Sequence, residues 1–554
     1  MGLKTVLHWG KGLFDVGKHL RFLSLAVIVM LLITAPVAAQ DALKTFTFGE
    51  FGDPVKLDAA VVTDGISFRV TRQGCENLLE FNPGTTQPGP GLAKSWSVSD
   101  DGLTWTLQLE EDVTFHDGTP FNAEAVKWNF DRWRFTDHPQ HFAEAAFEYY
   151  EAQFGGFDDE SIITNVEAKG EYEVVFTLSQ PMGAFLNNLA MSMFSISSPA
   201  AVEKYGADYG TPAVGFVCTG PFKFVKWETG VETVLERYAD YWGEFTGNVD
   251  RIVYRPIPDN AARFAALQNG TIDAFEQPNV QDIPAIEASD NLYIMLRPSF
   301  NVFYLAFNYR IAEFRNPLVR QAISLAIDRQ EIVDAFYVDG AVVANTMNPP
   351  TIAVGFNENI VTPYDPELAK QKLAEAGFPD GIEQVSVLAV DAEGNVTDEV
   401  VETIPVRVYY MPVVRPYNPA GEAIGEAIAS YLQDIGIKAE LASAGDWATY
   451  LAQRRNGELL GLYQLGWTGD NGDPDNFIGY FFAAADKPMP REGFYQNAAV
   501  ADLLQQGRVL SDPAEREPLY EEAEAIMAAN AERIYIAHGP VPLAFNKRVT
   551  GYIP

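Results

Sequence analysis

The sequence GWTGDNGDPDNF, residues 466–477, marks an abrupt change from apolar residues to Gly, Asp and Asn. The apolar run Leu459–Leu465 before it predicts a buried strand, and the residues after it are typical of tight turns. Because a Trp and several carboxylates follow directly on the strand, this segment is a candidate ligand-binding loop. The alternative is a solvated turn in which one Asp caps a helix.

The size and charge of the chain exclude several classes of protein. It has 554 residues, 47% of them hydrophobic and 12% aromatic, with a net charge of −36. Such a length exceeds what one hydrophobic core usually holds, so we expect two or three domains. The strong negative charge repels nucleic acid and anionic membranes, so neither is an expected partner.

The first 39 residues have the pattern of a signal peptide. Four basic residues precede an apolar run, Phe22–Ile33, that is short for a membrane span, and Val37–Ala39 offers small residues for cleavage. We therefore expect cleavage near Ala39 and a periplasmic or extracellular protein. A retained N-terminal anchor is the alternative.

The exported part contains two cysteines, Cys75 and Cys218. An even number of cysteines in an oxidising compartment favours a disulfide. Two buried, unpaired thiols are the alternative, because the sequence alone does not bring the two residues within bonding distance.

The order in which predicted strands and helices follow one another changes near residue 297. Before this point, hairpins such as 96–109 and 222–237 indicate an α+β region rich in antiparallel strands. After it, strands alternate with helices, which favours a largely parallel, helix-covered sheet. We therefore predict an α/β protein built from two different lobes. Two single helices are also predicted, over residues 64–79 and 317–337.

The sequence lacks the motifs of several enzyme and metal-binding classes. It contains no GxSxG, GxxxxGK or HExxH motif. His138 and His141 could share a helical face, but no third ligand joins them at a regular spacing, and zinc usually needs three or four. The cluster Asp470–Asp475 lacks the Gly and the closing Glu of a calcium loop. We expect neither an enzyme nor a metal or other cofactor.

A second candidate loop is MPVVRPYNP, residues 411–419, in which prolines restrict the backbone around Arg415. Both this loop and Asp470 follow predicted strands of the same α/β region, and such loops border the crevice where α/β sheets bind ligands. One cation and one anion on two stiff loops suit a small zwitterion. The alternative for Arg415 is an ion pair with a surface carboxylate.

Segments along nearly the whole chain resemble one family of proteins. The chain is similar to the peptide-binding branch, and most of all the dipeptide-binding branch, of the family 5 extracellular solute-binding proteins, which serve ATP-binding-cassette (ABC) importers. The segments that carry this resemblance are residues 91–132, TGPFKF (219–224), NPLVRQAISLAIDRQEIV (316–333), MPVVRPYNP, GWTGDNGDPDNF and IAHGPV (536–541).

The resemblance implies a two-lobed clamp of the class II-like periplasmic-binding-protein type. The first lobe would comprise residues 40–297, with an extra subdomain at about 70–210, and the tail 538–554. The second lobe would comprise residues 298–537. The function implied is that of a monomeric receptor that captures dipeptides or short peptides between the lobes and delivers them to a membrane permease. Glutathione, an oligopeptide, an opine or an oligosaccharide are alternative ligands, and an exported hydrolase is a further alternative.

The resemblance also implies roles for individual residues. The family's aspartate that receives the ligand's α-ammonium group corresponds to Asp470, and its arginine that receives the terminal carboxylate corresponds to Arg415. The other residues expected to contact ligand are Pro416 and Tyr417 beside the arginine, Trp467, Thr468 and Gly469 in the wall of the site, and Thr63 in the first lobe.

The chain departs from the family pattern at three places, one of which is its end, Gly551–Pro554, somewhat short of the usual tail. Cys218 stands before TGPF where the family usually has Gly, which fits a disulfide with Cys75. An acidic insertion, Val390–Glu402, precedes the arginine loop and could alter the rim of the site. The size of the ligand therefore stays open.

Overall fold

The computed structural model describes residues 43–142, 147–352, 354–483 and 488–553. The predicted signal peptide, residues 1–39, lies outside these ranges. Within them, no helix combines the length and the apolar character needed to cross a bilayer.

The first large sheet has seven strands in the order β12-β20-β11-β1-β10-β9-β8. Strand β1 pairs in parallel with β10 and β11, and the remaining pairings are antiparallel. This mixture agrees with the predicted α+β character of the N-terminal half. The strands are β1 (Thr45–Glu50), β8 (Phe222–Glu228), β9 (Glu232–Arg237), β10 (Arg251–Pro256), β11 (Ala274–Glu276), β12 (Leu292–Arg297) and β20 (Val541–Asn546), and the neighbouring helices are α7 (Asn260–Gln268) and α8 (Ile283–Glu287).

The second large sheet has the order β14-β19-β13-β18-β16-β15, with β17 also paired to β16. Only β16–β17 and β16–β18 are parallel among its pairings, so the expectation of a largely parallel sheet was wrong. Antiparallel pairs arise in part because β13, which follows the connection from the first sheet, runs opposite to both of its neighbours, β18 and β19. The strands are β13 (Asn301–Phe307), β14 (Val342–Val343), β15 (Gln384–Val390), β16 (Val396–Tyr409), β17 (Ala439–Ala442), β18 (Leu462–Thr468) and β19 (Ile534–His538).

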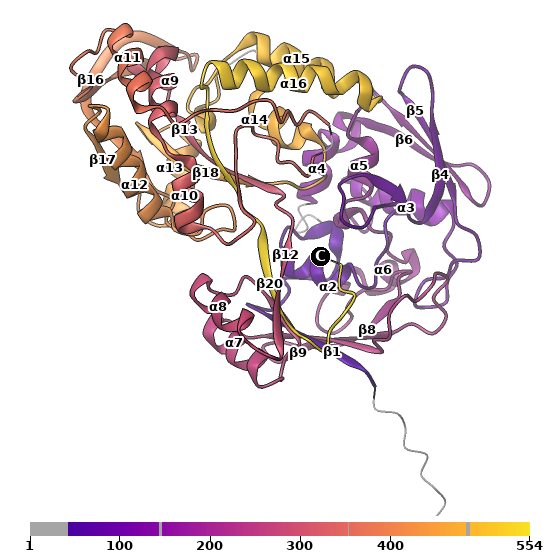
Figure 1. The fold of residues 1–554 in the computed structure, drawn as a ribbon. Coiled ribbons are helices and arrows are strands. Elements are labelled where there is room, and N and C mark those ends of the chain that lie inside the picture. Colours follow the sequence, from indigo (N-terminus) through magenta and orange to yellow (C-terminus); the bar gives the residue numbers. More distant parts are fainter. Residues whose placement is uncertain (1–42, 143–146, 353, 484–487, 554) are drawn as a thin grey trace, which may run out of the picture. The chain divides into compact units, whose positions relative to one another are not determined.

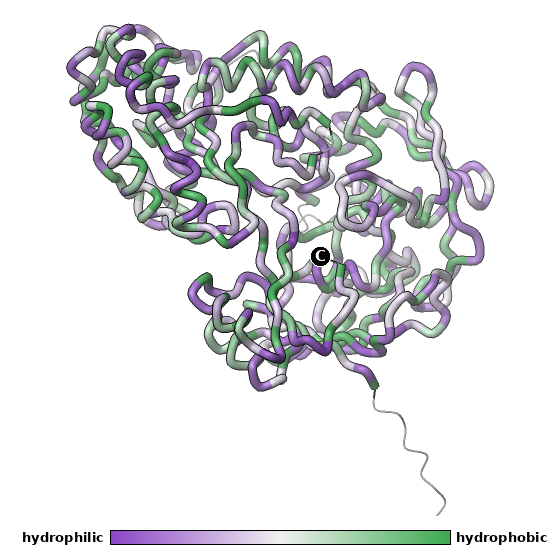
Figure 2. The backbone as a smooth tube through the Cα atoms, viewed as in Figure 1, coloured by the Kyte–Doolittle hydropathy of each residue, from purple (hydrophilic) through white to green (hydrophobic). Residues whose placement is uncertain are grey.

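Helices cover the second sheet and bury its apolar residues. Every residue of β13 is buried, as expected for a central strand with helices on its faces. Figure 2 shows polar and apolar residues alternating along α15 and α16, the pattern of helices with one buried face. The helices are α9 (Pro317–Ala326), α10 (Arg329–Phe336), α11 (Pro366–Glu375), α12 (Gly421–Asp434), α13 (Trp447–Arg455), α14 (Tyr480–Phe482), α15 (Ala498–Arg508) and α16 (Pro513–Ala529).

A smaller unit lies between β1 and β8 in the sequence and has its own core. It contains a four-stranded sheet in the order β4-β5-β7-β6 and a two-stranded sheet β2-β3. Aromatic residues fill its interior, as Phe130 and Phe176 do in edge-to-face contact. Its elements are β2 (Leu79–Phe81), β3 (Pro88–Pro90), β4 (Ala93–Val98), β5 (Thr104–Leu109), β6 (Ile163–Ala168), β7 (Glu173–Leu178), α3 (Ala123–Arg134), α4 (Glu148–Phe154), α5 (Phe185–Leu189) and α6 (Pro199–Tyr205).

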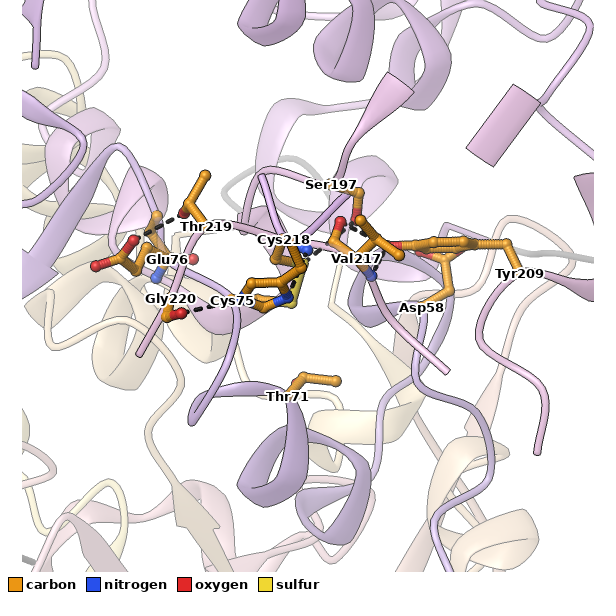
Figure 3. The surroundings of a disulfide bond; sticks show 12 residues. Asp58, Thr71, Cys75, Glu76, Ser197, Tyr209, Val217, Cys218, Thr219 and Gly220 are labelled. Atoms are coloured by element: carbon orange, nitrogen blue, oxygen red, sulfur yellow. Dashed lines mark hydrogen bonds between the residues drawn. A yellow bond between two sulfur atoms is a disulfide. The ribbon is translucent and has the colours of Figure 1, made fainter. Parts of the chain in front are cut away.

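A disulfide joins Cys75 to Cys218 across 143 residues of sequence (Figure 3). Both cysteines are buried. The Cys75 N–H donates to the Thr71 carbonyl at 2.7 Å, and the Cys218 carbonyl accepts from the His116 N–H at 2.8 Å. The bond thus connects the two ends of the segment that forms the smaller unit.

Two predicted helices differ from the observed ones. Helix α2 (Gly65–Thr71) ends well before Leu79, and the carbonyls of Gln73 and Gly74 accept instead from the N–H groups of Phe222 and Gly220, at 3.1 and 2.9 Å. The segment 317–337 forms α9 and α10 instead of one helix. Asp328 caps the second, its carboxylate accepting from the Glu331 N–H at 3.0 Å, a capping signal that the apolar periodicity masked.

The chain passes from one large sheet to the other twice, between β12 and β13 and between β19 and β20 (Figure 1). The two crossings are joined by side-chain hydrogen bonds. Asn301 Nδ2 donates to the Gly539 carbonyl at 2.7 Å, and the Gly539 N–H donates to Asn301 Oδ1 at 3.0 Å. We propose that the predicted lobe boundaries, near residues 297 and 538, coincide with these crossings.

Candidate ligand-binding site

The two predicted loops begin at the same edge of the second sheet. Strands β16 and β18 are parallel neighbours, with Val408 opposite Leu462 and Tyr409 opposite Tyr463. Because parallel strands end at the same edge, the loop that holds Arg415 and the loop that holds Asp470 both start there. The structure therefore places the two loops predicted from the sequence at one edge of the sheet.

A buried glutamine on β18 fixes the arginine loop. Gln464 Oε1 accepts from the Met411 N–H at 3.1 Å and from Asn418 Nδ2 at 3.0 Å, and Gln464 Nε2 donates to the Gly421 carbonyl at 2.9 Å. Both the oxygen and the nitrogen of this side-chain amide thus hold the loop in one conformation. We expect little movement of the loop relative to the strand.

Tyr417 and Pro416 pack this loop onto its neighbours. Gly466 leaves the space for the Tyr417 ring, since a Cβ at Gly466 would lie 2.2 Å from a ring carbon. The Pro416 carbonyl lies beside Gly539 in the crossing between the sheets, where a Cβ would approach it to 2.5 Å. Burial raises the pKa of the Tyr417 phenol, and the nearby Arg415 guanidinium opposes that rise.

Asp470 is a half-buried carboxylate held by two neutral donors. Its Oδ1 accepts from the Tyr149 hydroxyl at 3.2 Å, and its Oδ2 accepts from Asn476 Nδ2 at 3.1 Å. Burial raises the pKa of Asp470, and the two hydrogen bonds reduce that rise without cancelling it. Among the residues that the structure describes, no Lys, Arg or His forms an ion pair with Asp470.

Arg415 is a half-buried cation without a carboxylate partner in the described ranges. Its Nη1 donates to the Val414 carbonyl at 3.1 Å, and its guanidinium carbon lies 5.6 Å from the centre of the Trp447 ring. The alternative of an ion pair with a surface carboxylate is therefore not observed. The guanidinium retains donors for an external acceptor.

The residues expected in the wall have different roles. The Trp467 ring stacks on Tyr480, with ring centres 5.2 Å apart, and its Nε1 donates to Asn476 Oδ1 at 3.3 Å. Thr468 is exposed. The Gly469 N–H already donates to the Phe300 carbonyl at 2.9 Å, so its backbone can offer a ligand only the carbonyl group.

Thr63 lies in the exposed turn before α2. The Phe68 ring of α2 packs edge-to-face on Tyr149, with ring centres 6.1 Å apart, and Tyr149 in turn reaches Asp470. This series of contacts connects the helix that follows Thr63 with the anionic residue of the site. A direct contact of Thr63 with ligand stays a prediction.

The segment GWTGDNGDPDNF, residues 466–477, is called the Gly-Asp motif below, and its remaining acids form internal ion pairs. Asp473 makes a two-point pair with Arg516, at 2.6 and 2.7 Å, and its Oδ1 accepts from the Asp475 N–H at 2.9 Å. Asp475 pairs with Arg508 at 3.0 Å. In the described part of the chain, no group of three or more His, Cys, Asp or Glu residues could hold a metal ion.

Two residues that hold Asp470 were missed by the sequence analysis. Asn476 belongs to the quoted motif, and its side chain bonds both the carboxylate and the N–H of Asp470. Tyr149 is 321 residues away in the sequence, and no local pattern links it to this loop.

The acidic insertion does not border the site. Residues 390–402 form the end of β15, the turn after it and the first half of β16. The arginine loop leaves from the other end of β16, after Tyr409. Even Glu402 lies seven residues before that end, roughly 20 Å along an extended strand. The insertion extends a hairpin away from the two candidate loops.

Comparison with known proteins agrees with this architecture. The family model described as "Bacterial extracellular solute-binding proteins, family 5 Middle" matches residues 87–488. The dipeptide-binding protein of Escherichia coli is 31% identical over 535 residues, covering 94% of each chain. The heme-binding protein A of Haemophilus influenzae is 32% identical over 529 residues, covering 93% of this chain and 91% of that one.

Two solved structures show the same fold. HbpA2 from Haemophilus parasuis has a TM-score of 0.80 at 30% identity, covering 92% of this chain and 97% of the other. The ABC transporter-associated periplasmic binding protein DppA from Helicobacter pylori, in complex with the peptide STSA, has a TM-score of 0.69 at 29% identity, covering 92% and 95%. These are two-lobed periplasmic binding proteins. The chain therefore belongs to the bacterial extracellular solute-binding proteins of family 5.

Proposed function

We propose that this protein is the substrate-binding receptor of an ABC importer and that it captures dipeptides or short peptides for delivery to a membrane permease. One observation carries the proposal. Asp470 and Arg415, opposite in charge and each without an ion-pair partner in the described ranges, follow two adjacent parallel strands. A ligand with an ammonium group at one end and a carboxylate at the other would neutralise both.

The chemistry of the two residues fits the two ends of a peptide. The Asp470 carboxylate would accept hydrogen bonds from the α-ammonium group, and the planar Arg415 guanidinium would bind the terminal carboxylate at two points. Charge-assisted bonds of this kind strengthen when the site is closed to water. Because both termini would be fixed, the distance between the anchors would select ligand length more strongly than side-chain identity.

The family supports a transport role and not a catalytic one. The relatives and structural neighbours are binding proteins, and in the two-lobed fold ligand binding would shift an equilibrium between open and closed lobes. We infer a monomeric, exported receptor, with lobes formed by residues 40–297 plus 538–554 and by residues 298–537. The partners would be a short peptide and the membrane permease.

A thermal-shift screen with the purified protein tests the proposal. Dipeptides and tripeptides should raise the melting temperature, the more so the more tightly they bind, whereas free amino acids and sugars should not. Glutathione and haem belong in the same screen, because glutathione also carries both end groups and a haem-binding relative is equally similar. Stabilisation by a sugar or by haem, without any by peptides, would contradict the proposal.

Blocked peptides give a sharper test of the two anchors. An N-acetyl dipeptide lacks the ammonium group, and a dipeptide amide lacks the carboxylate. Each should bind at least tenfold more weakly than the free dipeptide, because one buried charge of the protein loses its partner. Equal affinities would refute the assignment of Asp470 and Arg415. Recovery of the bound peptide intact, by mass spectrometry, distinguishes a receptor from a hydrolase.

A further inference from the structure

Tyr149 connects the smaller N-terminal unit to the proposed ammonium site. It lies in the first turn of α4, and its hydroxyl donates to Asp470 Oδ1 at 3.2 Å. The same unit contacts the next residue of the motif as well: Asn187 Nδ2 donates to the Asn471 carbonyl at 2.9 Å, and Asn471 Nδ2 donates to Asn188 Oδ1 at 2.7 Å. The loop that holds Asp470 is thus held from both sides.

The direction of the Tyr149 side chain is fixed by the residues around it. Phe147, two residues earlier, has a left-handed backbone with φ of 45°, which is unfavourable for a bulky residue and persists only where packing requires it. Its ring is fully buried and stacks on His141, with ring centres 4.3 Å apart. The Tyr149 ring packs on Phe68. These contacts hold the start of α4 and aim the hydroxyl at Asp470.

The two donors on Asp470 have complementary roles. Asn476 belongs to the same loop and also accepts from the Asp470 N–H at 2.9 Å, so it shapes the loop as well as the carboxylate. Tyr149 comes from a distant segment and contacts the carboxylate through its hydroxyl alone. Because a carboxylate oxygen accepts more than one hydrogen bond, Oδ1 can receive a ligand ammonium group beside the Tyr149 hydroxyl.

No charged group near Asp470 in the described ranges stabilises its carboxylate, so only neutral donors do so. On the same loop, Asp473 and Asp475 are paired with Arg516 and Arg508. Burial, and after it the charges of Asp470 and of Glu148 on α4, raises the pKa of the Tyr149 phenol, so its proton is retained for donation. No cation in the described ranges supports the charged form of Asp470.

We propose that Tyr149 is a positioning residue for peptide binding: its hydroxyl keeps the Asp470 carboxylate ionised and oriented to receive the ligand's ammonium group. The inference rests on the proposed function. It gives the smaller N-terminal unit a role in ligand affinity, although that unit is remote in sequence from both anchors. A hydrogen bond to the charged form of an acid lowers its pKa, so removal of the hydroxyl would make Asp470 easier to protonate.

The test compares Tyr149→Phe with Tyr150→Phe in the full protein. The Tyr150 hydroxyl, next in the same helix, bonds Ser161 at 2.9 Å and does not contact the site, so this control removes one buried hydroxyl without touching Asp470. Dipeptide dissociation constants are measured by calorimetry from pH 4 to pH 8, and melting temperatures are recorded for every variant.

Tyr149→Phe should bind a dipeptide about tenfold more weakly than the wild type at neutral pH. Binding should also fail at a higher pH during acidification, whereas Tyr150→Phe should follow the wild-type pH profile. Unchanged affinity and pH profile in Tyr149→Phe would overturn the inference, and so would tighter binding, which would show that the hydroxyl competes with the ammonium group. Equal weakening in both variants, with no change in the pH profile, would likewise reduce Tyr149 to a packing role.

This inference and the proposed function can fail separately. If no dipeptide binds the wild-type protein, the proposed function fails. If dipeptides bind and Asp470→Asn abolishes binding, while Tyr149→Phe changes nothing, only the role of Tyr149 fails.

Discussion

Each half of the Gly-Asp motif contains a buried or half-buried aspartate, but only the one in the second half has a cationic partner among the described residues. Asp473, only 2% exposed, is paired with the equally buried Arg516. Within the described residues, the carboxylate of Asp470, three residues earlier, accepts only from a hydroxyl and an amide. A buried carboxylate paired with an arginine serves the fold, whereas one left without a cation costs stability. This contrast supports the proposal that Asp470, and not Asp473, binds the ligand.

The largest expected effect is on stability and comes from Asp473→Asn. The substitution leaves the buried Arg516 guanidinium without its counter-charge, which should lower the free energy of unfolding by about 3–5 kcal/mol. Urea unfolding followed by fluorescence measures the loss. A loss below 1 kcal/mol would show that Asp473 and Asp470 do not differ as the structure indicates.

Asp470→Asn should have the opposite profile. Peptide affinity should fall by about 3 kcal/mol, because the ligand's ammonium group would face a neutral amide. The free energy of unfolding should stay constant or rise slightly, since the variant no longer buries an unpaired carboxylate. Calorimetry and urea unfolding of the same preparation separate the two quantities. A large loss of stability without loss of binding would reverse the proposed roles.

The pH dependence of wild-type binding follows from the raised pKa of Asp470. The protonated carboxyl cannot pair with an ammonium group, so affinity should fall as the pH drops through that pKa. The α-ammonium group, with an ordinary pKa near 8, stays charged throughout this acidic range. Titrations at a series of pH values should show this fall in the wild type, and Asp470→Asn should lack it.

Arg415→Ala should weaken peptide binding by about 2 kcal/mol through loss of the carboxylate anchor. Stability should change by less than about 0.5 kcal/mol, because the guanidinium has no carboxylate partner in the described ranges. A dipeptide amide is the matched probe. Its affinity should be the same for Arg415→Ala and the wild type, while Asp470→Asn should still weaken it.

The smallest effect is expected for Asp475→Asn. Its partner Arg508 is 41% exposed, and a pair open to solvent contributes little, so a loss of about 1 kcal/mol in the free energy of unfolding is expected. Peptide affinity should be unchanged. A loss as large as that of Asp473→Asn would mean that exposure does not distinguish the two pairs.

The positions of the two loops were easier to predict from the sequence than the contacts that distant residues make with them. The loops after β16 and β18 could be placed at one sheet edge because each follows a strand that apolar residues mark clearly. The ion pair of Asp473 was not predicted, because its partner Arg516 lies 43 residues away on α16 and no local pattern indicates the pair. The contact from Tyr149 was missed for the same reason.

In the fold, too, local features were predicted and features that depend on distant residues were not. The hairpins over residues 96–109 and 222–237 were predicted from local sequence, and so was the helix start at Pro317. The end of α2 at Thr71 was not predicted, because the groups that bond the carbonyls after it come from Gly220 and Phe222, far away in the sequence. The antiparallel strands of the second sheet depend on where the chain crosses between sheets, which no local pattern encodes.

The bond between Cys75 and Cys218 also determines how the protein responds to a protease. It encloses the whole segment that carries Tyr149 and its supporting helices in one covalent ring. A single cut anywhere between the two cysteines would therefore release no fragment, and the nicked protein would keep its full mass. Loss of a piece from this region requires two cuts.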